Sequence, residues 1–132
     1  MIVDTSAWID YIRANGSHAH LRLRRAMQRK EALWIPAVVL QEVLQGARSP
    51  DHYLALQRDL DRLPAYEPED VRELHRAAAM LYARCRWQGL TPRSPIDCIV
   101  AACALQADMP LLANDRDFAV LAQVEPKLTL VP

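Results

Sequence analysis

The chain has 132 residues, of which 52% are hydrophobic and 24% are charged, and its formal net charge is zero. This length suits one domain with a sizeable core, and the neutral balance argues against a surface coated throughout with basic residues for nucleic acid. With only three glycines and no GxxxxGK[ST] or GxGxxG motif, the sequence excludes the common glycine-rich phosphate loops.

Short apolar stretches alternate with amphipathic ones along the chain. In chain order they predict a strand at 2–3, helices over 6–13 and 17–30, a strand at 32–35, helices over 37–45 and 49–63, a strand within 63–68, a helix over 69–88, a buried Ala-rich helix within 93–108, a strand at 111–113, a helix over 116–121 and a last strand at 128–131. This alternation is typical of an α/β fold with a mostly parallel sheet covered by helices on both faces. No linker or repeat interrupts it, so we expect a single domain over residues 1–132.

Four acidic residues fall at informative places in this pattern. Asp4 directly follows the first strand, and Asp115 follows the strand at 111–113. Ligands of such sheets bind beyond the carboxyl ends of the strands, so both acids are expected at the edge that forms a site. Glu42 lies in the helix over 37–45 and Asp97 in the first turn of the Ala-rich helix, where both can face the same cleft.

Carboxylates gathered in one cleft repel each other unless protons or cations compensate. Oxygen ligands without a nearby His or Cys cluster suit Mg²⁺ or Mn²⁺ better than Zn²⁺. Such ions can activate water and stabilise the charge that develops during phosphodiester cleavage.

Each acid also has an ordinary structural explanation. Asp4 can cap a helix, and Glu42 can be a solvated residue on a helix face. Asp97 stands three residues after Ser94, close to a capping-box pattern. The two acids of the NDRDF stretch can be turn or cap residues. The argument for a shared site therefore rests on the positional agreement of all four.

Four stretches of the chain together resemble the PIN domain, and most closely the VapC-type ribonuclease toxins of toxin–antitoxin pairs. They are "MIVDTSAWIDYI", "WIPAVVLQEVLQGA", "SPIDCIVAACALQADMPLLANDRDF" and "LTLVP". They follow the family's order with nearly the family's spacing and span almost the whole chain. The resemblance implies a three-layer α/β/α sandwich with a mostly parallel central sheet, and an acidic pocket that holds Mg²⁺ or Mn²⁺.

The resemblance also implies roles for particular residues. Asp4, Glu42 and Asp97 match the best-defined acids of the family. Asp115 matches the fourth, and Asp117 is the close contender for that position. Asp4 and Asp97 are expected to ligate the metal directly, with Glu42 and Asp115 ligating through water or orienting it. The supporting residues are Thr5, Ser6 and Asn114. The implied reaction is hydrolysis of an RNA phosphodiester by water activated at the metal.

The basic residues suggest a substrate surface, and the resemblance implies the partners. A basic run from Arg13 to Lys30 contains no acid and can form either a phosphate-binding strip or a solvated helix face. The candidate RNA-binding residues are Arg22, Arg25, Arg29, Arg93 and Arg116. The resemblance implies structured RNA such as tRNA as substrate, a cognate antitoxin that blocks the acidic site, and a homodimer.

Other side chains are expected to be ordinary. The four histidines are predicted to lie on the surface, and the three cysteines, which lack CxxC spacing, to be reduced and mostly buried. The chain shows no secretory signal or membrane span, so we expect a cytoplasmic protein.

Two alternative functions stay open from the sequence. One is a non-catalytic PIN-like module that binds RNA or a protein partner. The other is a nuclease directed at DNA, or a processing factor. The retained set of acids favours a catalytic protein over the first, and the small size favours a toxin over the second.

Overall fold

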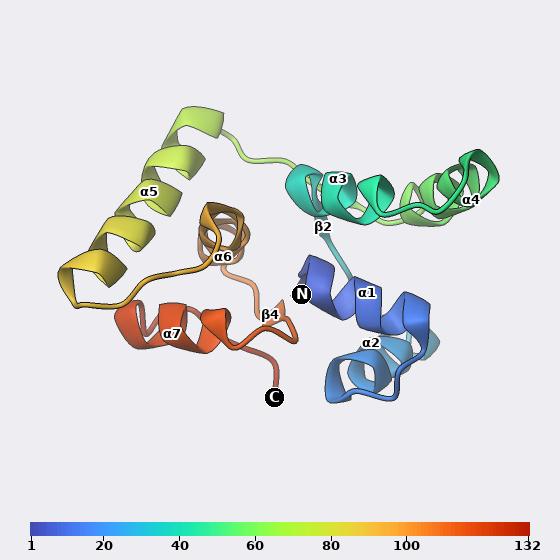
Figure 1. Ribbon diagram of the computed structural model, residues 1–132, viewed down its shortest axis with the longest axis horizontal. Helices are drawn as coiled ribbons and strands as arrows, with labels where there is room; N and C mark the ends of the chain where they lie inside the picture. The colour runs from blue at the N-terminus through green and yellow to red at the C-terminus, as the bar shows by residue number, and fades with distance from the viewer.

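The computed structural model describes all residues from Met1 to Pro132 as seven helices around four short strands (Figure 1). The strands are β1 (Ile2–Val3), β2 (Ile35–Pro36), β3 (Ala65–Tyr66) and β4 (Leu111–Leu112). The helices are α1 (Thr5–Arg13), α2 (His18–Gln28), α3 (Ala37–Gln45), α4 (Pro50–Leu60), α5 (Val71–Trp87), α6 (Pro95–Ala107) and α7 (Asp117–Val124). Each helix and strand corresponds to one predicted from the sequence.

All strand pairings are parallel, as predicted. β1 pairs with β4, and β2 pairs with β3. A parallel bridge between Ile2 and Trp34 joins these two pairs, which gives the order β3-β2-β1-β4. The last predicted strand, at 128–131, is reduced to one bridge between Leu130 and Leu111, in which the Leu111 N–H donates to the Thr129 carbonyl and the Val131 N–H donates to the Leu111 carbonyl.

The helices cover the sheet from both sides, which makes the three-layer sandwich expected from the sequence. Figure 1 shows α1 to α4 on one side of β4 and α5 to α7 on the other. Helix α6 packs against both α5 and α7, and α1 packs against α2 and α3. The strands need this double cover, because consecutive strand residues point to opposite faces of the sheet.

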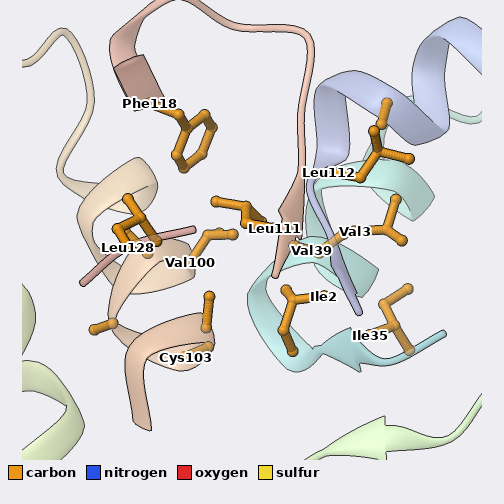
Figure 2. Close-up of a cluster of buried hydrophobic side chains, with 14 of the residues drawn as sticks. Ile2, Val3, Ile35, Val39, Val100, Cys103, Leu111, Leu112, Phe118 and Leu128 are labelled. Atoms are coloured by element: carbon orange, nitrogen blue, oxygen red, sulfur yellow. The ribbon is translucent and has the colours of Figure 1, made fainter. Parts of the chain in front are cut away.

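The buried side chains form one cluster, shown in part in Figure 2. Ile2, Val3, Leu111 and Leu112 have no exposed surface, so both faces of the central strands are buried. This explains why β1 and β4 are continuously apolar rather than alternating. Phe118 of α7 points toward the same cluster in Figure 2 and is 1% exposed.

The turn between α1 and α2 brings a correction to the sequence analysis. Gly16 has a φ of +78°, a left-handed conformation that glycine adopts without strain. Its N–H donates to Nδ1 of His20 at 3.0 Å, and His20 is buried with 8% exposure. The prediction that all histidines lie on the surface is therefore wrong for His20, because its hydrogen bond holds the ring inward against the turn.

The cysteines match the prediction. Cys85, Cys98 and Cys103 are free and buried. Burial raises the pKa of the Cys98 thiol to about 12 and that of Cys103 to about 11, so both stay protonated and unreactive near neutral pH. None of the helices combines the length and the apolar composition needed to cross a membrane.

Candidate metal centre

The strand order places two of the predicted acids at one sheet edge. From β1 the chain crosses to β2 on one side and later to β4 on the other, so the order of strands reverses at the β1–β4 pair. A crevice forms beyond the carboxyl ends of strands at such a point. Asp4 follows β1, and its backbone N–H donates to the carbonyl oxygen of Leu112 at 2.9 Å. Asp115 follows β4 on the neighbouring strand.

A cluster of three carboxylates lies at this edge. Asp97, Asp115 and Asp117 each offer a carboxylate oxygen, and these oxygens lie within 4.8 Å of one another. Asp97 comes from the first turn of α6, Asp115 from the loop after β4, and Asp117 from the first residue of α7. The sequence left open whether Asp115 or Asp117 is the fourth acid of the site. In the structure both lie next to Asp97, in the same cluster.

Asp4 and Glu42 face the same cluster. Burial, as the largest cause, and the negative charges of Asp4, Asp115, Asp117 and Glu42, in that order of effect, together raise the pKa of Asp97 to about 7. Burial is also the main reason that the pKa of Asp4 is raised, and hydrogen bonds from Ser6 offset part of this. These acids repel one another when ionised, so a bound cation would stabilise the site strongly.

Hydroxyl groups hold two of the acids in place, as the resemblance implied. The Thr5 hydroxyl donates to Oε1 of Glu42 at 2.6 Å, which links α1 to α3. The Ser6 hydroxyl donates to Oδ2 of Asp4 at 2.6 Å and accepts from the backbone N–H of Asn114 at 2.9 Å. Ser6 therefore ties the end of β1 to the loop that follows β4, and so joins the two halves of the site.

The structural explanations that competed with a metal site account for these acids only in part. Asp4 does cap α1, since its Oδ2 accepts from the N–H of Ser6 at 3.0 Å. The Asp97 carboxylate forms no hydrogen bond, and the cap of α6 is Ser94, whose hydroxyl accepts from Ile96 N–H at 3.1 Å. A half-buried carboxylate without a hydrogen bond is costly for the fold unless it binds something.

Asp117 offers the most deeply buried carboxylate oxygen of the cluster. Its side chain is buried, and its Oδ2 has no hydrogen-bond partner. The Arg93 Nε lies 3.3 Å from that oxygen, but the geometry is not that of a hydrogen bond, and the Arg93 side chain is 61% exposed. Together with the Asp97 carboxylate, this oxygen fits a small divalent cation held by oxygen ligands. The residues present therefore suit Mg²⁺ or Mn²⁺.

A cavity of about 500 Å³ opens beside Glu42. Its polar lining includes Arg13 of α1, Arg48 of the α3–α4 loop and His52 of α4, over an apolar floor. Sequence reasoning missed Arg48 and His52 as site neighbours, because they lie outside the basic run and reach the site only through the packing of α4 on α3.

Two of the five arginines predicted to bind RNA lie against carboxylates of the protein itself. Arg22 pairs with Glu31 at 2.9 Å, so its charge is already compensated within the protein. Arg93 lies against Asp117, at the edge of the acidic cluster. Arg25, Arg29 and Arg116 are exposed.

The raised pKa of Asp97 predicts a pH-dependent effect of the Asp97→Asn change on stability. Between the usual value of 3.8 and about 7, the folded protein keeps a proton that the unfolded chain has released. The contribution of Asp97 to stability is therefore lost as pH rises through this window. In EDTA, we expect wild type and Asp97→Asn to have similar Tm values at about pH 4, and the variant to have the higher Tm at about pH 8. Thermal unfolding followed by circular dichroism at both pH values measures this, and a variant with the lower Tm at the higher pH contradicts it.

Comparison with known proteins gives an independent view of the chain. The family model described as "PIN domain" matches residues 1–124. VapC ribonuclease Mb1587 of Mycobacterium bovis is 34% identical over 125 residues, covering 94% of this chain and 92% of the relative. Ribonuclease VapC11 of Mycobacterium tuberculosis has the same identity and coverage.

Solved structures show the same fold. The crystal structure of VapBC2 from Rickettsia felis, bound to a DNA fragment from their promoter, has a chain that superposes with a TM-score of 0.72. That chain is 17% identical in sequence, and the match covers 98% of this chain and 96% of the other. At this identity the likeness supports the fold, which agrees with the strand order and layers described above.

Proposed function

Since this chain belongs to the PIN-domain family, we propose that it is an endoribonuclease toxin of the VapC type, dependent on Mg²⁺ or Mn²⁺ and neutralised by a cognate VapB-type antitoxin. The identity to VapC ribonucleases extends over nearly the full length of both chains, which supports this activity over the other activities that a PIN fold can carry. The acids of the site are its proposed functional residues.

One observation carries the proposal: carboxylates from four separate segments converge beyond the ends of β1 and β4, and several of their oxygens have no protein partner. The Oε2 of Glu42 and the Oδ2 of Asp115 form no hydrogen bond, because Thr5 and the Asp117 N–H engage only the other oxygen of each. A structural role in capping or ion pairing would leave fewer oxygens free.

We assign the roles of the acids from their position and surroundings. Asp4, Asp97, Glu42 and Asp115 are the proposed catalytic and metal-holding residues, and Asp117 joins them because it lies in the same cluster as Asp97 and Asp115. When bound, the metal supplies a Lewis acid that activates water and offsets charge on the phosphodiester. Thr5 and Ser6 orient Glu42 and Asp4 through their hydroxyl groups.

Cleavage of RNA by the purified chain tests the proposal. A short unstructured RNA and a total tRNA pool are incubated with Mg²⁺, with Mn²⁺ and with EDTA, after calorimetry has measured metal binding. We expect cleavage only with a divalent metal. Absence of both RNA cleavage and divalent-metal binding would favour a non-catalytic RNA- or protein-binding module, and cleavage of DNA alone would favour the DNA-directed nuclease. Cleavage that persists in EDTA would contradict metal dependence.

The partner proposals follow the family. We propose tRNA as the RNA class and the cytoplasm as the compartment where the chain meets it. We also propose a homodimer, which light scattering of the purified chain would test. Met80 and Trp87, two exposed apolar side chains seven residues apart on the same face of α5, are a surface that a second copy could cover.

We propose that the cavity beside Glu42 receives the RNA backbone, because Arg13 and Arg48 place positive charge next to this acid. Binding of labelled RNA by an Asp97→Asn background protein, which should not cut it, isolates this role. Adding Arg13→Ala or Arg48→Ala should weaken binding and reduce the slope of log affinity against log salt by about 1. Arg58→Ala, an exposed arginine on α4 outside the cavity, is the matched control. Equal slopes for all variants would contradict the assignment.

A further inference from the structure

Asp10 is a carboxylate near the site that no step above uses. It lies on α1, one turn after Ser6, and is half-buried. Its Oδ2 accepts from Nδ2 of Asn114 at 2.6 Å and from the hydroxyl of Ser17 at 2.7 Å. Its Oδ1 accepts from Nδ2 of Asn15 at 2.8 Å. One side chain therefore joins α1, the start of α2 and the loop after β4.

Asp10 is not part of the metal-holding group. Its carboxylate already accepts from three side chains, and it is absent from the cluster of Asp97, Asp115 and Asp117. Partial burial alone would raise its pKa, but the hydrogen bonds from Ser17, Asn15 and Asn114 outweigh this and lower it. Asp10 therefore stays ionised, and its bonds to neutral donors are charge-assisted and strong.

The contact with Asn114 matters because of where Asn114 stands. Asn114 is exposed and directly precedes Asp115, whose Oδ1 in turn accepts from the Asp117 N–H at 2.9 Å. Ser6 holds the backbone N–H of Asn114, and Asp10 holds its side chain. The loop carrying two acids of the cluster is thus fixed to α1 at two points, one helical turn apart.

We propose that Asp10 is a positioning residue for the nuclease site, which acts by holding Asn114 so that Asp115 and Asp117 meet Asp97 in the geometry that binds the metal. This inference rests on the proposed metal-dependent function. Carboxylates in a metal site need orientation from neighbouring groups, and replacing such neighbours commonly costs about 10–100-fold in metal affinity or activity. Asp10 acts through Asn114 and touches neither the metal nor the RNA.

The Asp10→Asn variant tests this with little change in shape. We expect calorimetry to show Mn²⁺ binding weakened about tenfold and kcat for RNA cleavage reduced by about the same factor. The KM for RNA should stay close to that of wild type, because Asp10 lies outside the cavity that carries Arg13 and Arg48. A change in KM alone, with Mn²⁺ affinity unaltered, would overturn the proposal.

Two further variants separate positioning from general stability. Asn15→Ala removes the partner of Oδ1 and leaves Asn114 bound, so it should keep the Mn²⁺ affinity and kcat of wild type even if its Tm falls. Asn114→Ala removes the same contact from the other side. Either single change removes the contact between Asp10 and Asn114. The double variant Asp10→Asn with Asn114→Ala should therefore bind Mn²⁺ as tightly as the single variant that binds it more weakly.

The outcomes distinguish this inference from the proposed function. Additive losses in the double variant, or wild-type Mn²⁺ affinity in Asp10→Asn, would overturn the positioning role while leaving the nuclease intact. A loss of Mn²⁺ affinity in Asn15→Ala equal to that in Asp10→Asn would also overturn it, by showing that the turn and not Asn114 is responsible. If wild type itself binds no divalent metal, the proposed function fails instead.

Discussion

Replacing Asp97 by asparagine should reduce RNA cleavage by at least about a hundredfold, since even groups that only orient metal ligands cost up to about that much. Asp97 is the residue on which the charges of Asp4, Asp115, Asp117 and Glu42 all act. Asparagine keeps the shape of the side chain but removes the negative charge, so the site attracts a divalent cation less strongly. Initial rates of cleavage in saturating Mg²⁺ and Mn²⁺ measure the effect.

Asp108→Asn is the matched control for this change. Asp108 caps the other end of the same helix, α6, and is exposed. Its φ of +51° is a left-handed conformation that asparagine also tolerates, so the change should cost little stability. We expect wild-type cleavage from Asp108→Asn. If Asp97→Asn cleaves as fast as this control, Asp97 has no part in the reaction.

The same pair of experiments links activity to stability. The Asp97→Asn variant is expected to lose cleavage while gaining stability without metal near neutral pH. A negative charge on the half-buried Asp97, close to four other acids, destabilises the folded state when no cation offsets it. Loss of both RNA cleavage and stability in this variant would indicate a folding defect rather than the loss of one metal-binding carboxylate. Parallel series with Asp115→Asn and Asp117→Asn would then show which of the two contributes more to metal affinity.

The largest expected effect on stability comes from Phe118→Ala. Phe118 is 1% exposed and is the largest of the fully buried side chains. Truncating a buried phenylalanine to alanine costs about 3–5 kcal/mol, through lost burial and the cavity that is left. Whole domains are stable by only about 5–15 kcal/mol, so the variant should be close to unfolding. Urea denaturation followed by circular dichroism measures the free energy of unfolding.

Phe118 also matters for the site, since it adjoins Asp117 at the start of α7. Its burial against the core shown in Figure 2 anchors that helix start, and with it one acid of the cluster. Phe118→Leu keeps an apolar side chain and should lose much less stability, and it should bind Mn²⁺ nearly as well as wild type. A Phe118→Ala variant with wild-type stability would contradict the burial on which this argument depends.

The amino-acid sequence by itself was enough to predict the parallel strands, the helices that cover them and the sheet edge at which the acids gather. Strands buried on both faces must be continuously apolar, and β1 and β4 are. Asp4 and Asp115 follow these strands directly in the chain, so their place at one sheet edge follows from the parallel arrangement. The hydroxyl groups of Thr5 and Ser6 were expected to support the acids from their resemblance to the family, and the structure shows their hydrogen bonds.

Other features depended on contacts between residues far apart in the chain, which periodicity and spacing cannot reveal. Asn114 meets Asp10 across 104 positions, and Arg84 meets Glu125 across 41. Sequence patterns describe which face of a helix is apolar but say little about which polar side chains on two different elements will meet. The basic run contains no acid that could pair with Arg22. In the structure the chain turns after the end of α2, and Glu31 forms an ion pair with Arg22.

The cluster of carboxylates shows most clearly which features the sequence predicts and which depend on the tertiary structure. The sequence supplied Asp115 and Asp117 two residues apart and could not choose between them, because either could face the site from a loop of unknown conformation. In the folded chain, the Asp117 N–H donates to Asp115, and α7 begins at that point, so both side chains lie beside Asp97. The backbone conformation of that loop, set by Ser6 and Asp10 on a distant helix, decided what the order of residues left open.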